Sequence, residues 1–369
     1  MASRRSPRRV APATRTFTAA SLINFSDALL IALGVPKGHA HIVSESLVAA
    51  NVRGVDSHGI QMLATYIQQI RAGGVNVRGV GKVASVNGAC LLYDGQNSLG
   101  QVVSDRCVKQ VLRLVKRSGL ALVVARNSNH FGAGAYWGQE LARAGCIGIV
   151  MSNACPAVAP WQGAEARLGT NPICMAVPGA ESGGWLLDMA TTTVALGKLS
   201  NFAFLGQPAI PLSWGFLDAK GQPTTKIPDA QKGSPTPTGG YKGTALAMMV
   251  ELLCAGLSGG AMATDLPVYR TGGDPLGISH MFLAIDTRRF LPAGQLKQRA
   301  RRLGKMIKAT KPAPGYAEVL VAGEPEWLTG LVRQKQGVPV PTRLWERLSV
   351  IAGELGVVPP APAARKKLS

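Results

Sequence analysis

The sequence of 369 residues predicts a protein of the mixed α/β or α+β class. Two apolar runs with β-branched residues, 119–125 and 146–151, are typical of buried strands. Residues 136–144 between them have the pattern of a helix. The longest apolar segment, 244–257, is interrupted by Glu251 and is too short to cross a bilayer. With 46% hydrophobic residues, the chain can bury a sizeable core, and its length suggests about two domains.

The first third of the chain is predicted to be largely helical. A helix can start at Thr18 or Ser21, because either hydroxyl could cap it, and Pro36 marks a turn. Residues 60–71 place apolar side chains at helical spacing. In chain order, the further elements expected here are a helix at 39–53, the helix at 60–71, a strand at 89–94 and a helix at 102–117.

The second half alternates strands, glycine-rich turns and helices. Residues 185–192 form an expected strand that carries Asp188, and 206–240 is rich in proline and glycine, long enough to be a flexible cover over a site. In chain order, the remaining elements expected are a buried helix at 241–257, a strand at 278–286, a basic helix at 291–308 and a helix at 342–355.

Net charge is +20, and part of it lies in the first residues. Residues 1–16 contain five arginines and no acid, which predicts a basic, disordered tail; the alternative is a segment that targets an organelle. The basic residues of 291–308 spread around a helix without interleaved aromatic residues, which favours a solvated helix over a nucleic-acid groove. Residues 357–369 are expected to form a loose tail.

Cysteine and histidine spacing argues against disulfides and metal. The six cysteines form no Cys-x-x-Cys pair and most lie in apolar segments, which predicts reduced thiols in a cytoplasmic protein. His39 and His41 have no third ligand near them in the sequence, so no metal site is expected.

The segment 127–134 contains the strongest functional candidate, His130. This histidine follows an apolar strand and precedes a helix, in a glycine-rich loop, where functional side chains of α/β proteins are often held. The alternative is a loop histidine that only bonds to the backbone. Other strand ends rich in small and amide residues follow, and Gly239 to Gly243 opens a helix with a lysine. Together they could form a pocket for a phosphate-bearing cofactor beside a proton donor.

Five segments in order resemble the malate/L-lactate dehydrogenase family, whose NAD(P)-dependent members include sulfolactate and ureidoglycolate dehydrogenases, diketogulonate reductase and piperideine-2-carboxylate reductase. The resemblance extends over residues 17–356. The five segments are Arg53-Gly-Val-Asp-Ser-His-Gly59, Asn127-Ser-Asn-His-Phe-Gly132, Leu168-Gly-Thr-Asn-Pro172, Leu187-Asp-Met-Ala-Thr191 and Gly240-Tyr-Lys-Gly243.

The resemblance implies a non-Rossmann NAD(P)-binding fold with a large mixed sheet, in agreement with the absence of Gly-x-Gly-x-x-Gly after a strand. It implies an NAD(P)-binding domain at 119–290 and a second domain built from 17–118 with 291–356. It further implies a homodimer with the site near the subunit contact, NAD or NADP as cofactor, and a small 2-oxo or 2-hydroxy acid as substrate. No nucleic-acid or membrane partner is expected.

The resemblance also implies roles for single residues. His130 and His58 match the family histidines described as proton acceptor or donor, a task that suits imidazole near neutral pH. Asp188 could orient an imidazole or bind cofactor hydroxyls. The expected substrate contacts are Ser57, Arg53 and Asn129, and the expected cofactor contacts are Ala154, Asn171, Asp188, Met189, Ala190, Lys242, Gly243, Gly323 and Glu324.

One position departs from the family pattern. An arginine usually stands four residues after the histidine, well placed to bind the substrate carboxylate, but this chain has Met62. Either another cation, such as Arg53 or Lys198, replaces it, or the substrate is not a simple 2-oxo acid. If the turn after His58 is helical, the arginine of Met62→Arg would lie on the same face as His58 and should raise kcat/KM for a small 2-oxo acid by roughly tenfold or more.

Three functions follow from these residues. The first is hydride transfer between NAD(P) and a 2-oxo or 2-hydroxy acid, and the second is reduction of a cyclic-imine carboxylate, which protonates nitrogen instead of oxygen. The third is a non-catalytic dimeric relative. The presence of His58, His130, Asp188 and Lys242 argues for an enzyme, since a non-catalytic protein has no chemical need for all four.

Overall fold

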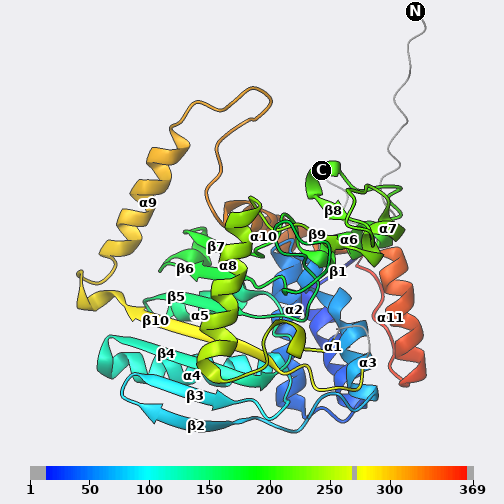
Figure 1. The fold of residues 1–369 in the computed structure, drawn as a ribbon, viewed down its shortest axis with the longest axis horizontal. Coiled ribbons are helices and arrows are strands. Elements are labelled where there is room, and N and C mark those ends of the chain that lie inside the picture. The colour runs from blue at the N-terminus through cyan, green and yellow to red at the C-terminus, as the bar shows by residue number, and fades with distance from the viewer. Residues whose placement is uncertain (1–13, 268–271, 364–369) are drawn as a thin grey trace, which may run out of the picture.

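A seven-stranded mixed sheet runs through the centre of the computed structural model, which describes residues 14–267 and 272–363 (Figure 1). One neighbouring pair, β3 and β4, is parallel, and the other pairs are antiparallel. In spatial order the strands are β2 (Lys82–Asn87), β3 (Cys90–Asp94), β4 (Leu120–Ser128), β10 (Ile278–Asp286), β5 (Cys146–Ser152), β6 (Ile173–Ala176) and β7 (Leu186–Met189). The predicted mixed α/β class is confirmed.

Strand β10 lies between β4 and β5 and determines where their loops meet. His280 of β10 pairs with Ala125 of β4 and with Ser152 of β5. Because β10 is antiparallel to both, its first residues lie beside the last residues of β4 and β5. Ile173, at the start of β6, lies between Met151 and Met189, so β6 begins and β7 ends at the same side. We call this side the loop end of the sheet.

Helices pack on both faces of the sheet. Helices α4 (Gly100–Ser118) and α5 (Gly134–Arg143) cover one face, and α8 (Tyr241–Glu251) lies on the other with its π-helical continuation Leu252–Gly256. The expectation that 241–257 is a buried helix is wrong, because α8 packs along one side only. Tyr241, Met248 and Leu252 on its outer side are more than half exposed.

A second hydrophobic core joins the two ends of the chain. It contains α1 (Ala19–Ala32), α2 (Lys37–Val52), α3 (Leu63–Arg71) and α11 (Thr342–Glu354), with the strand pair β1 (Thr14–Phe17) and β11 (Val338–Pro341). The Thr18 hydroxyl caps α1 by accepting the Ser21 N–H at 3.1 Å, so the predicted helix start is confirmed.

Three predicted boundaries differ from the structure. Thr14–Phe17 pair with β11, so the tail predicted to reach residue 16 is at most residues 1–13, which lie outside the described residues. Residues 357–363 are held as well: Val357 packs on the second core and the Ala363 N–H donates to Thr16 O. Strands β2 and β3 belong to the sheet, so a boundary at 118/119 would cut the sheet. The division into two domains stays a prediction.

The segment 206–240 is less open than predicted, because it forms a small unit with its own core around Leu199, Ile210 and Phe216. The unit also includes α6 (Leu196–Phe204), which precedes the segment and carries Leu199. Within the segment lie a 3-10 turn at Leu212–Trp214, β8 (Phe216–Leu217), α7 (Ile227–Lys232) and β9 (Ser234–Pro235). Further 3-10 turns span Ala180–Ser182, Ala263–Asp265 and Thr287–Arg289.

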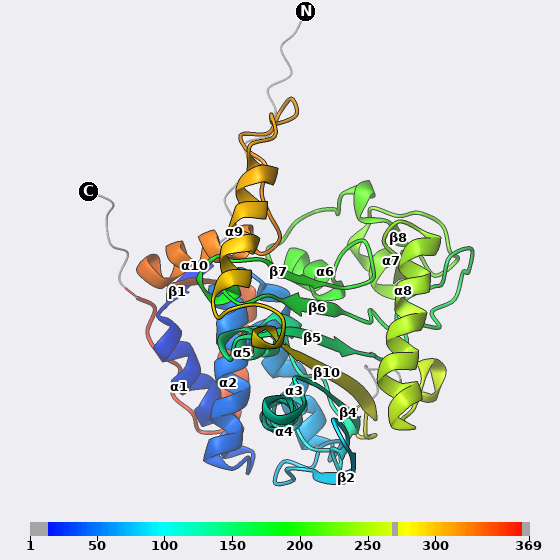
Figure 2. The same cartoon turned by 90° about the vertical axis from the view of Figure 1, so that its left-hand side faces the viewer.

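Helix α9 (Gln295–Lys308) projects from the body of the molecule and has no buried residue (Figures 1 and 2). The predicted solvated basic helix is confirmed, although it begins at Gln295 rather than at 291. Helix α10 (Glu324–Gln336) follows and returns the chain to the second core. Among the described residues, no helix has the length and apolar character needed to cross a membrane.

Candidate functional site

His58 and His130 lie together at the loop end of the sheet, although 72 positions separate them in sequence. Their rings are stacked, with centroids 5.6 Å apart and planes inclined by 24°. His130 follows β4, and His58 ends the 3-10 turn Asp56–His58. Loss of contact with water lowers the pKa of His58 to about 4 and that of His130 to about 3, the latter also through the neighbouring His58 and His280. Both rings are therefore neutral at pH 7.

Buried polar groups hold the Nδ1 atom of His130. The Tyr66 hydroxyl lies 2.6 Å from Nδ1, and the Gly132 N–H donates to the same atom at 3.3 Å. The Gln101 side-chain amide donates to the Tyr66 oxygen at 3.0 Å. Gly100 allows this approach, because a Cβ there would lie 2.1 Å from the Asn129 carbonyl oxygen. The His130 ring is thus fixed from α3 and α4.

A different set of contacts holds the His58 turn. Its Nδ1 lies 2.9 Å from the Ser57 hydroxyl. The neighbouring Asp56 forms a two-pronged ion pair with Arg333 of α10, at 2.7 and 2.9 Å. The Asn51 side chain bridges this turn by donating to Asp56 and accepting the Ile60 N–H. The C-terminal part of the chain therefore positions His58.

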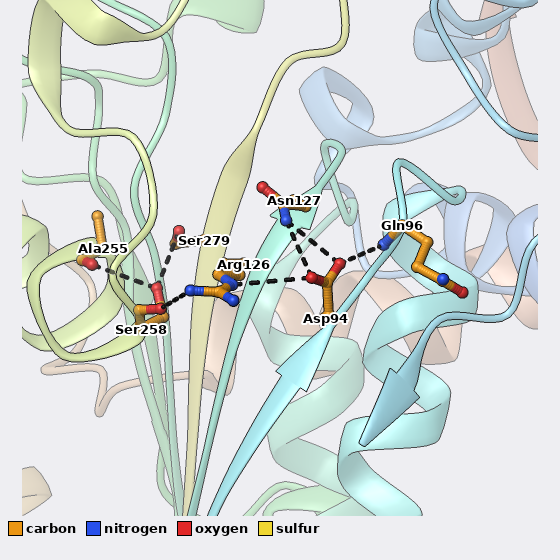
Figure 3. A network of polar contacts seen from close by, with 7 residues as sticks. All are labelled: Asp94, Gln96, Arg126, Asn127, Ala255, Ser258 and Ser279. Atoms are coloured by element: carbon orange, nitrogen blue, oxygen red, sulfur yellow. Dashed lines mark hydrogen bonds and ion pairs between the residues drawn. The ribbon is translucent and has the colours of Figure 1, made fainter. Parts of the chain in front are cut away.

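The start of the His130 loop is anchored by a polar network at the ends of β3 and β4 (Figure 3). Asp94 accepts hydrogen bonds from the Gln96 N–H and from the Asn127 side chain. Arg126 lies 3.8 Å from the same carboxylate and donates to Ser258 O, beyond the π-helical turn. Asn127 has a positive φ of 53°, which asparagine tolerates better than most residues. The network fixes where the loop leaves the sheet.

His280 supports the site from within the sheet. It is fully buried and lies between two hydroxyls, Ser152 at 2.9 Å from Nδ1 and Ser128 at 2.8 Å from Nε2. Its ring stacks on Phe131 of the His130 loop, with centroids 4.7 Å apart. Burial lowers the pKa of His280 to about 3. This neutral histidine joins the ends of β4 and β5.

Asp188 lies at the end of β7 beside the first turn of α5. It accepts the Ala135 N–H at 2.7 Å, and a side chain at Gly134 would collide with it. Surrounding protein raises the pKa of Asp188 to about 6, while the Ala135 N–H and the guanidinium of Arg53 oppose the rise. Asp188 as a whole residue is nevertheless exposed. The Nδ1 atoms of both histidines face hydroxyls. The predicted role of Asp188, to orient an imidazole or to bind cofactor hydroxyls, stays a prediction.

Two predicted contact residues have their side chains engaged inside the protein. Asn129 is 4% exposed, and its amide donates to Asn97 and to Ser98 O. Asn171 is fully buried; its oxygen accepts the Ala154 N–H at 3.1 Å and its nitrogen donates to Glu251 at 2.9 Å. These amide groups help to shape the loops. The substrate contact expected for Asn129 and the cofactor contact expected for Asn171 stay predictions.

The other predicted cofactor residues are spread over three elements. Met189 and Ala190 follow Asp188 at the end of β7, and Ala154 follows β5. Lys242 and Gly243 begin α8, where Lys242 is exposed and Gly243 packs against the backbone of Thr238 and Thr191.

Gly323 and Glu324 lie at the start of α10. Gly323 has a φ of 85° and packs on Leu186 of β7. Glu324 accepts the Val321 N–H at 3.0 Å and pairs with Lys308 at the end of α9. Glu324 therefore helps to hold the C-terminal end of α9. Its predicted cofactor contact would have to compete with this ion pair.

Met62 does not occupy the place that helical spacing predicted. Gly59 is extended, with φ −89° and ψ −152°, and separates the turn Asp56–His58 from the turn Ile60–Met62. A Cβ at Gly59 would lie 2.2 Å from the Asn51 amide, so this break is built into the packing. Met62 packs against the second core. The expectation that Met62 shares a helix face with His58 is wrong.

Tyr66, Gln101, His280 and Arg333 were missed by sequence reasoning. His280 gave a signal, since it is a lone imidazole in an apolar strand. Tyr66 and His130 are 64 positions apart, and no local pattern connects them.

Two stacked histidines lie at the loop end of the sheet, with Asp188 at the end of β7. The comparisons with known proteins show the class to which this chain belongs. Residues 17–349 match the family model described as malate/L-lactate dehydrogenase. Malate dehydrogenase from Pyrococcus horikoshii is 37% identical over 91% of this chain and 94% of its own length. Its solved structure superposes with a TM-score of 0.86, over 94% of this chain and 97% of that one.

More distant relatives have other substrates in their names. L-sulfolactate dehydrogenase from Methanocaldococcus jannaschii is 33% identical over 88% of this chain and 92% of its own length. The structure of Δ1-piperideine-2-carboxylate reductase from Pseudomonas syringae has a TM-score of 0.78 and 27% identity, over 92% of this chain and all of that one. The chain belongs to the malate/L-lactate dehydrogenase family and is an oxidoreductase that acts on the CH–OH group of hydroxy acids.

Proposed function

We propose that the loop end of the sheet is where this dehydrogenase converts a small 2-hydroxy acid into the 2-oxo acid, and that His58 and His130 both face the substrate oxygen. The observation that carries the proposal is the stacked pair of neutral imidazoles, 5.6 Å apart. One or both can exchange a proton or a hydrogen bond with the reacting oxygen. Ser57 orients His58 through its hydroxyl.

The oxidant is NAD or NADP, and the residues around Asp188 fit such a molecule. Asp188 offers a carboxylate that can accept hydrogen bonds from ribose or amide groups. The start of α8 offers backbone N–H groups and Lys242 without an acidic residue in the first turn, which favours phosphate. Asp188, Met189, Ala190, Lys242, Gly243 and Ala154 would hold the cofactor. When bound, the nicotinamide supplies the hydride acceptor.

Arg53 is the best candidate to bind the substrate carboxylate in place of an arginine at position 62. It ends α2 near Asp188 and is partly buried, and among the described residues its Nε has no hydrogen-bond partner. Lys198, the alternative, is exposed and lies 5.2 Å from the Trp214 ring. A guanidinium can bind a carboxylate through two parallel hydrogen bonds.

A second candidate substrate is a cyclic-imine carboxylate. The structural likeness to the piperideine-2-carboxylate reductase favours it, as does the loss of the usual arginine at Met62. The proton would then go to nitrogen instead of oxygen, with the same residues in place.

We also infer a homodimer and a cytoplasmic location. The outer side of α8 and the apolar stripe of α9, with Leu303 and Met306 more than half exposed, offer apolar surface for a second copy. All six cysteines are unpaired, which suits a reducing compartment. The alternative of organellar targeting concerns residues 1–13, outside the described residues.

Oxidation of NADH and of NADPH, followed by absorbance, tests the proposed reaction. The panel consists of oxaloacetate, pyruvate, 3-sulfopyruvate and piperideine-2-carboxylate. We expect turnover with at least one 2-oxo acid. Turnover with the imine alone would favour the second candidate, and no turnover with any panel member by a folded protein would contradict both.

A further inference from the structure

The hydrogen bonds around His130 determine which of its nitrogen atoms carries the proton. A backbone N–H can only donate, so the Gly132 N–H at 3.3 Å requires a lone pair on Nδ1. The hydrogen in the 2.6 Å contact between Nδ1 and the Tyr66 oxygen must then belong to Tyr66. Two donors therefore point at Nδ1, and the proton of the neutral ring lies on Nε2.

Gln101 keeps the Tyr66 hydroxyl in this direction. Its amide nitrogen donates to the Tyr66 oxygen at 3.0 Å, which leaves the hydroxyl hydrogen to point at His130. Tyr66 and Gln101 are buried, and the cavity beside them has a volume of about 10 Å³, room for at most one water molecule. Solvent cannot readily rearrange these donors, and no substrate can reach His130 from this side.

His58 has a more adaptable partner. The Ser57 hydroxyl can donate to Nδ1 or, after rotation about its C–O bond, accept from it. The His58 ring can therefore gain a proton without displacing a donor. Protonation of Nδ1 in His130 would bring its new N–H against both the Gly132 N–H and the Tyr66 O–H.

We propose that Tyr66 is a positioning residue that fixes His130 as the Nε2–H tautomer, so that His130 gives a hydrogen bond to the reacting oxygen and His58 exchanges the proton. The inference rests on the proposed function for its consequence, because His130 must face the substrate. In the oxidation direction, the hydroxyl proton moves from the substrate oxygen to a His58 nitrogen. His130 keeps its own proton and stabilises the oxygen as a neutral donor.

Nitrogen-15 NMR of histidine in the full-length protein without cofactor tests the tautomer directly, since protonated and unprotonated ring nitrogens differ strongly in chemical shift. We expect Nε2–H for His130 at pH 7 in the wild type. Tyr66→Phe removes one donor, so the Nδ1–H form should appear or protonation should occur at higher pH. Tyr93→Phe is the control, because its buried hydroxyl donates to Val80 O elsewhere in the fold. An Nδ1–H tautomer in the wild type would overturn the proposal.

Kinetics then separate the inference from the proposed function. Tyr66→Phe should lower kcat about tenfold with an unchanged cofactor Kd, as expected for loss of one buried hydrogen bond. If Tyr66→Phe does not fold, Gln101→Met tests the same relay, because it frees the Tyr66 oxygen to accept from Nδ1. Unaltered His130 signals in every folded variant would contradict the role of Tyr66. Normal turnover in His130→Ala, together with the Nε2–H tautomer of His130 in the wild type, would contradict the proposed function of His130 and leave the tautomer assignment intact.

Discussion

The loops that carry the two histidines are built in opposite ways. His130 is held by groups whose hydrogen-bond roles are fixed, a backbone N–H and a buried phenol that an amide orients. His58 is held by a hydroxyl that can reverse its role, on a turn that an ion pair from α10 keeps in place. The surroundings of His130 favour a single protonation state of its ring. The surroundings of His58 allow its ring to gain or lose a proton.

Removal of either imidazole should have the largest effect. His58→Ala and His130→Ala should each lower kcat by about two to four orders of magnitude, since each removes a proton or hydrogen-bond partner of the reacting oxygen. The pH dependence of kcat should change in His58→Ala and keep its shape in His130→Ala. Steady-state kinetics from pH 5 to 9, with calorimetric cofactor Kd values as the control for folding, would show it. A changed profile in His130→Ala alone would reverse the assignment of roles.

The second-largest effect is expected from loss of the ion pair between Asp56 and Arg333, next to His58 in the chain. Arg333→Met leaves Asp56 without its guanidinium in a mostly buried place, which should lower the free energy of unfolding by about 2–4 kcal/mol. Arg71→Met is the matched control, because its pair with Glu354 is exposed and should contribute less than about 1 kcal/mol. Urea unfolding measures both. Equal decreases in the free energy of unfolding of the two variants would mean that the Arg333 ion pair stabilises the fold no more than an exposed pair does.

Acid should destabilise the folded protein through its buried histidines. The pKa of His58 is lowered to about 4 and that of His130 and His280 to about 3, against about 6.5 in the unfolded chain. The unfolded chain therefore binds more protons below pH 6.5, and the free energy of unfolding should decrease as pH falls from 6.5 toward 3. Each histidine can contribute at most about 1.4 kcal/mol per pH unit.

Urea unfolding at pH 7, 6 and 5 measures this slope. His280→Gln removes one titrating group and should give a shallower slope. A flat profile in the wild type would contradict the view that these rings stay neutral in the fold.

The smallest effect is expected at position 62. Because Gly59 is extended and Met62 packs on the second core, Met62→Arg would not bring its guanidinium to the face of His58. We expect kcat/KM for oxaloacetate to change by less than about threefold. A gain of tenfold or more would show that the turn rearranges. Arg53→Met in parallel should raise the KM for the same acid, and an unchanged KM would remove Arg53 from carboxylate binding.

Residues with a local pattern could be predicted from the sequence. His130 follows an apolar strand and begins a glycine-rich loop, Thr18 caps a helix, and the strand at 278–286 is continuous and apolar; all three match the structure. The predicted helix at 60–71 begins three residues before α3, which starts at Leu63. Helical spacing cannot reveal that Gly59 must be extended to pass the Asn51 amide.

Long-range partners gave no such pattern. Tyr66 and Gln101 look like ordinary helix residues, and only the packing of two helices against the His130 loop makes them part of the site. Asn129 and Asn171 showed the reverse problem. The family resemblance predicted ligand contacts for both, but burial directs their amides to the backbone and to Glu251. Sequence polarity alone does not distinguish a side chain that binds a ligand from one that shapes a loop.

The central place of β10 has a consequence for how the site comes into being. His280 bonds to Ser128 and Ser152, which precede it by 152 and 128 positions. Strands β4 and β5 do not pair with each other, so the two loops gain their common support only when a strand made much later enters between them. During synthesis, the first half of the chain can build its helices early, but the loops after β4 and β5 must wait for this late insertion. Such distant pairings are slow to form, and the candidate site should be among the last parts of the protein to fold.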